Sequence, residues 1–177
     1  MTLPADHTNA SAIRRASLTD LDAIVAVTNR AFVSERFCVS GDRTDAADVR
    51  QRFDAGIFFV IDDCADRGRL RGSVFCSMEH ARGYMGLLAV DPDAQGQGHA
   101  RSLLAAVEQQ CRDGGCNFLD ITVVNMREDL FPIYARLGFA ACDVLPFPVP
   151  ERALQPLHLV KMTKPLLLPP QMRSLPV

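Results

Sequence analysis

The early part of the chain alternates a short apolar run with two stretches of helical spacing. The run 12–16 predicts an edge strand. The segment 18–20 offers a helix N-cap ahead of a first helix that should reach about residue 32. Helical spacing returns over 45–53 and stops before a glycine, which predicts a second helix. The segment Val33 to Asp45 is expected to be an exposed loop between them.

Beyond residue 56 the pattern changes to short apolar runs separated by charged or glycine-containing turns. Three such runs predict strands that are most simply antiparallel: 57–61, 73–78 and 84–90. A helix over 100–112 and a strand over 118–124 follow. Because this order is strand, helix, strand, we expect 84–90 and 118–124 to run parallel with a right-handed connection.

The last part of the chain predicts one more helix and two more strands. The helix covers about 129–137, and the strands lie near 140–144 and 157–162, on either side of a proline-rich loop at 146–156. The tail 165–177 holds four prolines among leucines, so it cannot be a helix. A loose end and an extended arm packed on a neighbouring copy, as in a homodimer, both stay open for this tail.

Composition is ordinary for a globular protein and changes this picture little. The 177 residues are 48% hydrophobic and 23% charged, with a net charge of -2, which suits a single domain over 1–177 with a core at about 13–164. Scattered arginines give no electrostatic footprint for nucleic acid or an anionic membrane. No apolar segment resembles a secretory signal or a membrane span, so we expect a cytoplasmic location.

The six cysteines and four histidines do not predict a metal site. The sequence has no C-x-x-C pair, and its histidines lie far apart. Zinc sites in proteins need such closely spaced ligands. We therefore expect reduced, mostly buried thiols and no metal.

One glycine-rich loop carries the chemistry that the sequence indicates most directly. It joins the strand 84–90 to the next helix and reads Asp91-Pro92-Asp93-Ala94-Gln95-Gly96-Gln97-Gly98-His99-Ala100-Arg101. A helix N-terminus presents unpaired N–H groups and a positive dipole to an anion. Gly96 and Gly98 let the backbone approach a phosphate, and Arg101 places a cation where only a bound anion favours it. The loop predicts a phosphate site; a plain connector is the alternative.

Two other phosphate-binding loops do not fit these letters. A nucleotide P-loop needs Lys and then Ser or Thr after its last glycine, where this chain has His99 and Ala100. A dinucleotide fingerprint needs a third glycine for close packing of helix on strand, where this chain has Arg101. A nucleotide P-loop is therefore excluded, and a nucleotide-dependent oxidoreductase stays an alternative that binding of NADH would test.

The loop fits the pattern [Q/R]-x-x-G-x-[G/A], and with its flanks the sequence resembles the GNAT superfamily of acyl-CoA-dependent N-acyltransferases. The resemblance runs from about Ile13 to Lys164 and includes four ordered segments: 87–92, 100–104, 123–127 and 134–139. The stretches 29–32 and 41–44 also look like a bacterial branch with unassigned acceptors. The resemblance implies an α/β domain with a mixed sheet of about seven strands, about four helices, and splayed fourth and fifth strands.

The resemblance also implies roles for individual residues, with acetyl-CoA as co-substrate. The pyrophosphate would lie on the loop residues Gln95, Gly96, Gln97, Gly98, His99, Ala100 and Arg101. The pantetheine arm would pair with the backbone of Leu88, Ala89 and Val90, and the Leu88 N–H would stabilise the oxyanion of the thioester carbonyl. Asn125 would hold the same arm, although a simple turn residue accounts for it equally well.

Tyr134 aligns with the superfamily's frequent general acid, which contacts CoA and protonates its departing thiolate. A tyrosine with an ordinary pKa of about 10 is protonated at neutral pH, as this role requires. Leu130, Tyr134 and Leu137 also form a helical stripe, so a packing role for the tyrosine is the alternative.

The general base is not indicated by any single residue. Many relatives carry a glutamate on the fourth strand, but 82–86 has no carboxylate here and Tyr84 takes that place. Glu79 or His80 at the preceding turn, Glu35 from the early loop, and a chain of water molecules all remain candidates.

The sequence as a whole predicts direct transfer of an acetyl group from acetyl-CoA to a primary amine of a small molecule. The alternative is a domain that binds acyl-CoA as a sensor or scaffold without turnover. The loops 33–45 and 146–156 should wall the acceptor side, and their Glu35, Phe37 and Phe147 favour a small cationic or amphipathic amine.

Overall fold

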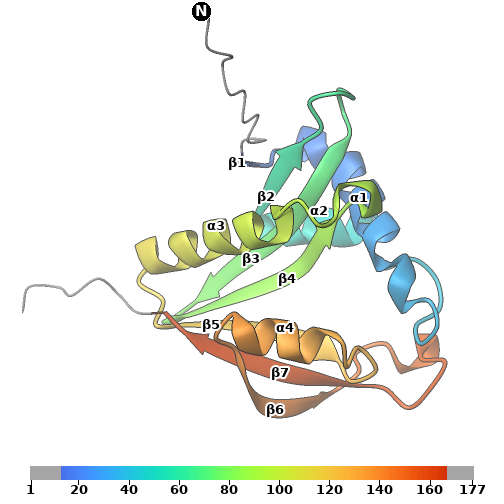
Figure 1. The fold of residues 1–177 in the computed structure, drawn as a ribbon, viewed down its shortest axis with the longest axis vertical. Helices are drawn as coiled ribbons and strands as arrows, with labels where there is room; N and C mark the ends of the chain where they lie inside the picture. The colour runs from blue at the N-terminus through green and yellow to red at the C-terminus, as the bar shows by residue number, and fades with distance from the viewer. Residues whose placement is uncertain (1–12, 167–177) are drawn as a thin grey trace, which may run out of the picture.

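The computed structural model describes residues 13–166. In that range, seven strands form one mixed sheet in the order β1-β2-β3-β4-β5-β7-β6, and four α-helices pack around it (Figure 1). The strands are β1 (Ile13–Arg15), β2 (Ile57–Asp62), β3 (Leu70–Glu79), β4 (Arg82–Val90), β5 (Phe118–Val124), β6 (Ala140–Pro146) and β7 (His158–Pro165). The helices are α1 (Leu21–Ala31), α2 (Ala46–Ala55), α3 (His99–Asp113) and α4 (Leu130–Arg136).

The predicted order of elements is confirmed, and the shifts at their ends have local causes. The α1 helix follows a 3-10 turn, η1 (Leu18–Asp20), whose Asp20 carboxylate accepts a hydrogen bond from the Ser17 N–H. The α2 helix is capped by Asp45, which accepts from the Asp48 N–H at 2.8 Å. Strand β3 begins at Leu70, three residues before the predicted start, because Leu70 is buried and pairs with β2.

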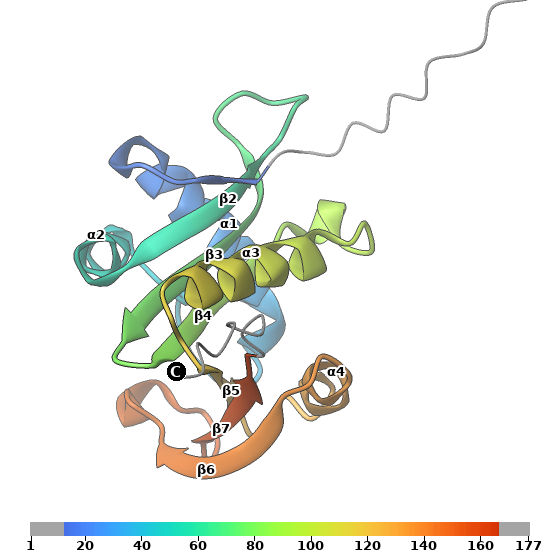
Figure 2. The same cartoon turned by 90° about the vertical axis from the view of Figure 1, so that its left-hand side faces the viewer.

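Two apolar cores lie on opposite faces of the sheet, because neighbouring residues of a strand point to opposite faces. On one face, α1 and α2 cover Phe58 and Val60 of β2. On the other face, α3 covers Phe59 and Ile61 of the same strand. Figure 2 shows α3 in front of the sheet with α1 behind it.

Strands β4 and β5 pair only at one end and then part. The parallel register joins Arg82, Gly83 and Tyr84 to Phe118, Leu119 and Asp120. Further along, Leu87 and Leu88 of β4 together face the single residue Val74 of β3, and Leu87 has a φ of 48°. This two-against-one arrangement is a β-bulge, which bends the strand that contains it. The splay that the resemblance implied is confirmed, and the bulge is its local cause.

The predicted C-terminal tail begins inside the sheet. Pro165 is the last residue of β7, and the buried Leu166 donates its N–H to the carbonyl of Asn117. The rest of the predicted tail, 167–177, lies outside the described residues.

The cysteines are all free, and four of the six are buried. Within residues 13–166, no cluster of three or more His, Cys, Asp or Glu side chains could hold a metal ion. None of the helices in the same range has both the length and the apolar character that a membrane span requires.

Candidate active site

A cavity of about 1390 Å³ lies where β4 and β5 part. Its walls come from both strands, the glycine-rich loop, α4, and the two loops that were expected to wall the acceptor side. The residues from β4 and the loop after it are Tyr84, Met85, Gly86, Leu87, Leu88, Val90, Pro92, Gln95 and Gly98. The parting of the strands therefore leaves one continuous space between the glycine-rich loop and the acceptor-side loops.

The glycine-rich loop has the backbone that an anion site requires. Gly96 and Gly98 have φ values of 77° and 83°, and nothing lies within 4 Å of the position that a Cβ would take at either residue. Gly98 is the N-cap of α3, and no side chain caps the helix there. The first N–H groups of α3 therefore remain available to a bound anion.

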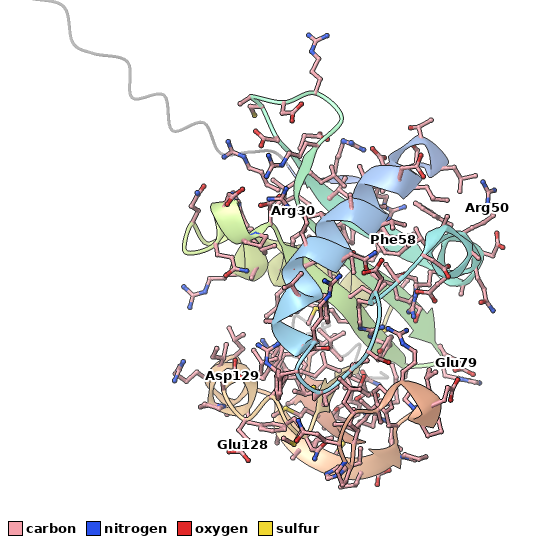
Figure 3. All side chains as sticks on the ribbon, turned by 90° about the vertical axis from the view of Figure 1, so that its right-hand side faces the viewer. Arg30, Arg50, Phe58, Glu79, Glu128 and Asp129 are labelled. Atoms are coloured by element: carbon pink, nitrogen blue, oxygen red, sulfur yellow. The ribbon has the colours of Figure 1, made fainter. Side chains whose placement is uncertain are left out.

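Ion pairs hold the base of this loop in place. The Asp91 carboxylate is buried and accepts from Arg30 at 2.9 Å and from Arg69 at 3.0 Å. Arg30 comes from α1 and lies beside the loop that leads into α3 (Figure 3). Asp91 also accepts from the Asp93 N–H at 3.0 Å. The loop is thus anchored to α1 and to the turn that precedes β3.

The predicted cofactor residues are distributed unevenly around the cavity. Those that line it are Leu88, Val90, Gln95, Gly98, Ala100, Arg101 and Tyr134. Ala89 is buried beside Leu88, and His99 has an Nε2 atom that is buried with no hydrogen-bond partner in the part of the chain that the structure describes. Gly96 and Gln97 are exposed on the outer turn of the loop.

Asn125 lies outside the cavity lining and holds the loop that precedes β7. Its Oδ1 accepts from the His158 N–H at 3.0 Å, and its Nδ2 donates to the Pro156 carbonyl at 3.5 Å. These contacts match the simple turn role that the sequence left open. Contact between Asn125 and the cofactor stays a prediction.

Glu35 is the candidate base that the structure brings into the cavity. It ends a 3-10 turn, η2 (Phe32–Glu35), and its side chain is buried. Arg127 lies 3.4 Å from its Oε1 and also pairs with Asp129 at 2.9 Å. Burial raises the pKa of Glu35, and the positive charges of Arg43 and Arg127 only partly oppose this shift. The carboxylate is therefore closer to proton exchange at neutral pH than an exposed glutamate.

The other two candidate bases lie at an exposed turn. Glu79 ends β3 and His80 follows it with a φ of 53°, and their side chains are 88% and 89% exposed. Neither lines the cavity, and Glu79 projects from the hairpin tip on the side of the molecule away from Asp129 (Figure 3). This geometry leaves Glu35 as the side-chain base candidate that can meet a bound substrate.

Tyr134 faces the cavity from α4 and packs against Phe139. The two rings meet edge to face, with centroids 5.7 Å apart and planes at 79°. Burial raises the pKa of the Tyr134 hydroxyl, with a smaller opposing influence from Arg127. The tyrosine therefore both packs and presents a protonated hydroxyl to the cavity. Tyr84 lines the same cavity, with its hydroxyl 3.3 Å from that of Thr122 across the parted strands.

The two acceptor-side loops are joined to each other. The Ser40 N–H donates to the Arg152 carbonyl at 2.8 Å, and the Leu154 N–H donates to the Cys38 carbonyl at 2.9 Å. Arg152 donates in return from its Nε to the Ser40 carbonyl at 2.8 Å. Sequence reasoning did not single out Arg43, Arg127 or Arg152, although all three line the cavity. Arg43 and Arg152 lie within the two loops already expected to form a wall, and Arg127 lies in the segment 123–127 that contributed to the resemblance.

Comparison with known proteins identifies the family that this chain resembles. A model of the acetyltransferase (GNAT) family matches residues 23–139. A mycothiol acetyltransferase of Propionibacterium freudenreichii subsp. shermanii is 34% identical over 131 residues, which cover 68% of this chain and 40% of that protein. One of Actinosynnema mirum is 31% identical over 124 residues, which cover 68% and 41%. The chain thus spans about 40% of the length of these curated relatives.

A solved structure supports the same fold. The ribosomal-protein-S18-alanine N-acetyltransferase from Escherichia coli matches with a TM-score of 0.71 at 18% identity, over 94% of this chain and 99% of that one. At this identity the likeness shows the fold alone. It confirms the predicted mixed sheet with its surrounding helices.

Proposed function

We propose that this chain, which belongs to the acetyltransferase (GNAT) family, transfers an acetyl group from acetyl-CoA to the primary amine of a small molecule. The observation that carries the proposal is the continuous cavity, which has uncapped backbone N–H groups near one end and the Glu35 and Tyr134 side chains among the rest of its walls. The name of the similar mycothiol acetyltransferases supports a small acceptor. A single domain over 1–177 and a cytoplasmic location belong to the same proposal.

The glycine-rich loop suits the pyrophosphate of acetyl-CoA. A side chain at Gly98 would meet no protein atom within 4 Å, so the space beside the α3 terminus is open to a ligand. The orphaned Nε2 of His99 adds an unsatisfied polar atom in the first turn of α3. Arg101, exposed in the same turn, supplies a positive charge. Acetyl-CoA contributes the activated acyl group, and these residues hold it.

Three groups of this chain then perform the transfer. Glu35 accepts a proton from the ammonium of the acceptor, and the free amine forms the new C–N bond at the thioester carbonyl. The Leu88 N–H, at the bulge of β4, stabilises the negative charge on the carbonyl oxygen. As the C–S bond breaks, Tyr134 gives its proton to the sulfur. Because the amine attacks directly, no cysteine is acylated.

Ligand binding and turnover test the proposal in that order. Acetyl-CoA at a hundred times its dissociation constant should stabilise the folded protein by about 2.7 kcal/mol, whereas NADH and ATP should have little effect. Unchanged thermal unfolding with millimolar acetyl-CoA would contradict the cofactor assignment. Release of free CoA should then depend on an added amine. Stabilisation without amine-dependent release would instead support a sensor or scaffold that binds acyl-CoA.

A further inference from the structure

Positive charge dominates the wall of the cavity. Among the lining residues within 13–166, Glu35 is the sole carboxylate. The cationic lining residues are Arg30, Arg43, Arg101, Arg127, Arg136 and Arg152. A cavity with this balance attracts anions and repels cations.

Three of these six arginines already have an assignment. Arg30 pairs with Asp91 and Asp93, and Arg127 pairs with Asp129 and Glu35. Arg101 belongs to the first turn of α3 beside the pyrophosphate loop. Two arginines on the acceptor-side loops, Arg43 and Arg152, have no carboxylate partner within ion-pair distance among the described residues.

Arg43 is held in the cavity without a salt bridge. Its guanidinium lies 5.2 Å from the centroid of the Phe32 ring, which also lines the cavity. The side chain has exposed surface, yet the protein around it displaces enough water to lower the pKa of the guanidinium, an effect that nearby Glu35 opposes. A partly desolvated cation stacked on an aromatic ring is ready to bind an anionic group that enters the cavity.

Arg152 places a second positive charge next to this segment. Its guanidinium donates to the backbone carbonyls of Ser40 and Asp42, the residue just before Arg43. These contacts fix the side chain but leave its positive charge without a negative partner. The loop that carries Arg43 is thus held by another arginine, so both cations border the same part of the cavity.

Arg43 lies outside the glycine-rich loop that is proposed to hold the pyrophosphate. The charged groups that influence it are Glu35, Arg52, Tyr84 and Asp48, none of which belongs to the glycine-rich loop. Tyr84 precedes Val90, where β4 leads into that loop, by six residues, and the strand between them bends at the bulge of Leu87 and Leu88. The anion that Arg43 binds therefore comes from the acceptor.

We infer that the acceptor is a zwitterionic amine, whose compact anionic group, a carboxylate or a phosphate, binds Arg43 while its ammonium binds Glu35. This inference rests on the proposed function and narrows its acceptor class. It also narrows the sequence-based expectation of a cationic or amphipathic amine, because an acceptor without an anionic group would leave Arg43 and Arg152 without a negative partner. A planar guanidinium suits both anions, since either can accept two parallel N–H bonds.

Matched pairs of amines test the inference. The two members of a pair share the same amine, but only one of them has an anionic group. One type of pair is an α-amino acid and its amide, and the other is phosphoethanolamine and ethanolamine. With the CoA-loaded parent protein, we expect calorimetry to show tighter binding of the anionic member of one pair type by about 10- to 100-fold, the range for a charge-assisted contact. The pair type that shows the difference distinguishes carboxylate from phosphate.

Three substitutions complete the test: two remove one positive charge each, at Arg43 and at a control position, and one keeps the charge at Arg43. Arg43→Gln should abolish the preference within a pair and leave acetyl-CoA stabilisation unchanged, and Arg43→Lys should retain part of the preference. Arg50→Gln is the matched control, because Arg50 is exposed on α2 outside the cavity lining (Figure 3). It should retain the full preference.

Several results would overturn the inference. The first is that the parent binds both members of every pair equally. The second is that it binds no anionic member. The third is that Arg43→Gln lowers the affinity for both members of a pair by the same factor. Failure of the proposed function has a different signature, which is no release of CoA with any amine. The binding comparison does not depend on turnover, so the two failures are distinguishable.

Discussion

The two ends of the cavity differ in how the chain builds them. In the proposed reaction, the donor end, where acetyl-CoA would bind, comes from one continuous segment, the loop from Asp91 to Arg101, and backbone N–H groups are its proposed contacts to an anion. The acceptor end collects side chains from distant segments, as the Ser40–Arg152 contact across 112 residues of sequence illustrates. Backbone recognition of a phosphate can be encoded locally, whereas proton transfer needs side chains that meet at one point. Substitutions at the two ends should therefore separate binding from catalysis.

The largest effect is expected at the donor end. Gly98→Val should lower acetyl-CoA affinity by at least about 100-fold, because losing two charge-assisted contacts has that effect. The branched side chain enters the space beside the α3 terminus and disfavours the φ of 83° at this residue. Gly68→Val is the matched control, since Gly68 has a φ of 90° and open space but lies in the β2–β3 turn. Equal loss of affinity in both variants would contradict the loop assignment.

At the acceptor end, Glu35→Gln should lower kcat by about 10³-fold, within the range for a general base, and leave acetyl-CoA affinity unchanged. The pH profile of the parent should fall on the acid side through the raised pKa of Glu35, as protonation removes the base. Glu79→Gln removes an exposed carboxylate outside the cavity and should turn over normally. A loss of the same size in Glu79→Gln would remove Glu35 from the mechanism.

Glu35→Gln, which should lower kcat, should not lower the stability of the folded protein. Because burial raises the pKa of Glu35 above its ordinary 4.5, the folded protein binds the proton more tightly than the unfolded chain. The free energy of unfolding therefore falls as pH rises from 4.5 through the raised pKa. Glu35→Gln removes that penalty, so its Tm above the raised pKa should equal or exceed that of the parent. A lower Tm would mean that the Arg127 contact outweighs the burial.

Tyr134 is proposed to act between the donor end and the acceptor end, and Tyr134→Phe should lower kcat by less than Glu35→Gln does. A general acid contributes about 10²- to 10⁴-fold in rate, and we expect the low end, because a thiolate is a tolerable leaving group and water can partly substitute. The ring and its contact with Phe139 remain, so the Tm should not change. Turnover within about twofold of the parent would exclude the acid role. A fall in Tm with normal turnover would assign the hydroxyl to structure.

Asn125→Ala should change acetyl-CoA affinity the least of these substitutions and should measurably lower the stability of the fold. Removing the amide leaves the His158 N–H without its acceptor, which costs about 1–3 kcal/mol when such a group is buried and less where water reaches it. Acetyl-CoA affinity should change by less than about threefold, since the lost contacts lie outside the cavity lining. A tenfold loss of affinity with unchanged chemical denaturation would instead place Asn125 at the pantetheine arm.

Particular residues show where prediction from sequence succeeded and where it failed. Gly96 and Gly98 were informative because only glycine readily adopts their positive φ. The splay of β4 from β5 came only through the resemblance, because the bulge residues Leu87 and Leu88 are as apolar as any core strand. Asn125 allowed two interpretations, since an amide at the end of a strand can hold either a ligand or a neighbouring loop.

The sequence by itself determined the order of elements and the glycine positions in the loop after β4, because periodicity, glycine positions and helix termini act over a few residues. Only the tertiary structure decided which carboxylate enters the cavity and which arginines remain without a carboxylate partner. Glu35 and Glu79 are the same residue type, and each lies in a connecting segment or at its edge. One is buried beside Arg127 and the other is exposed, because burial and charge pairing depend on segments that fold next to a residue from far along the chain.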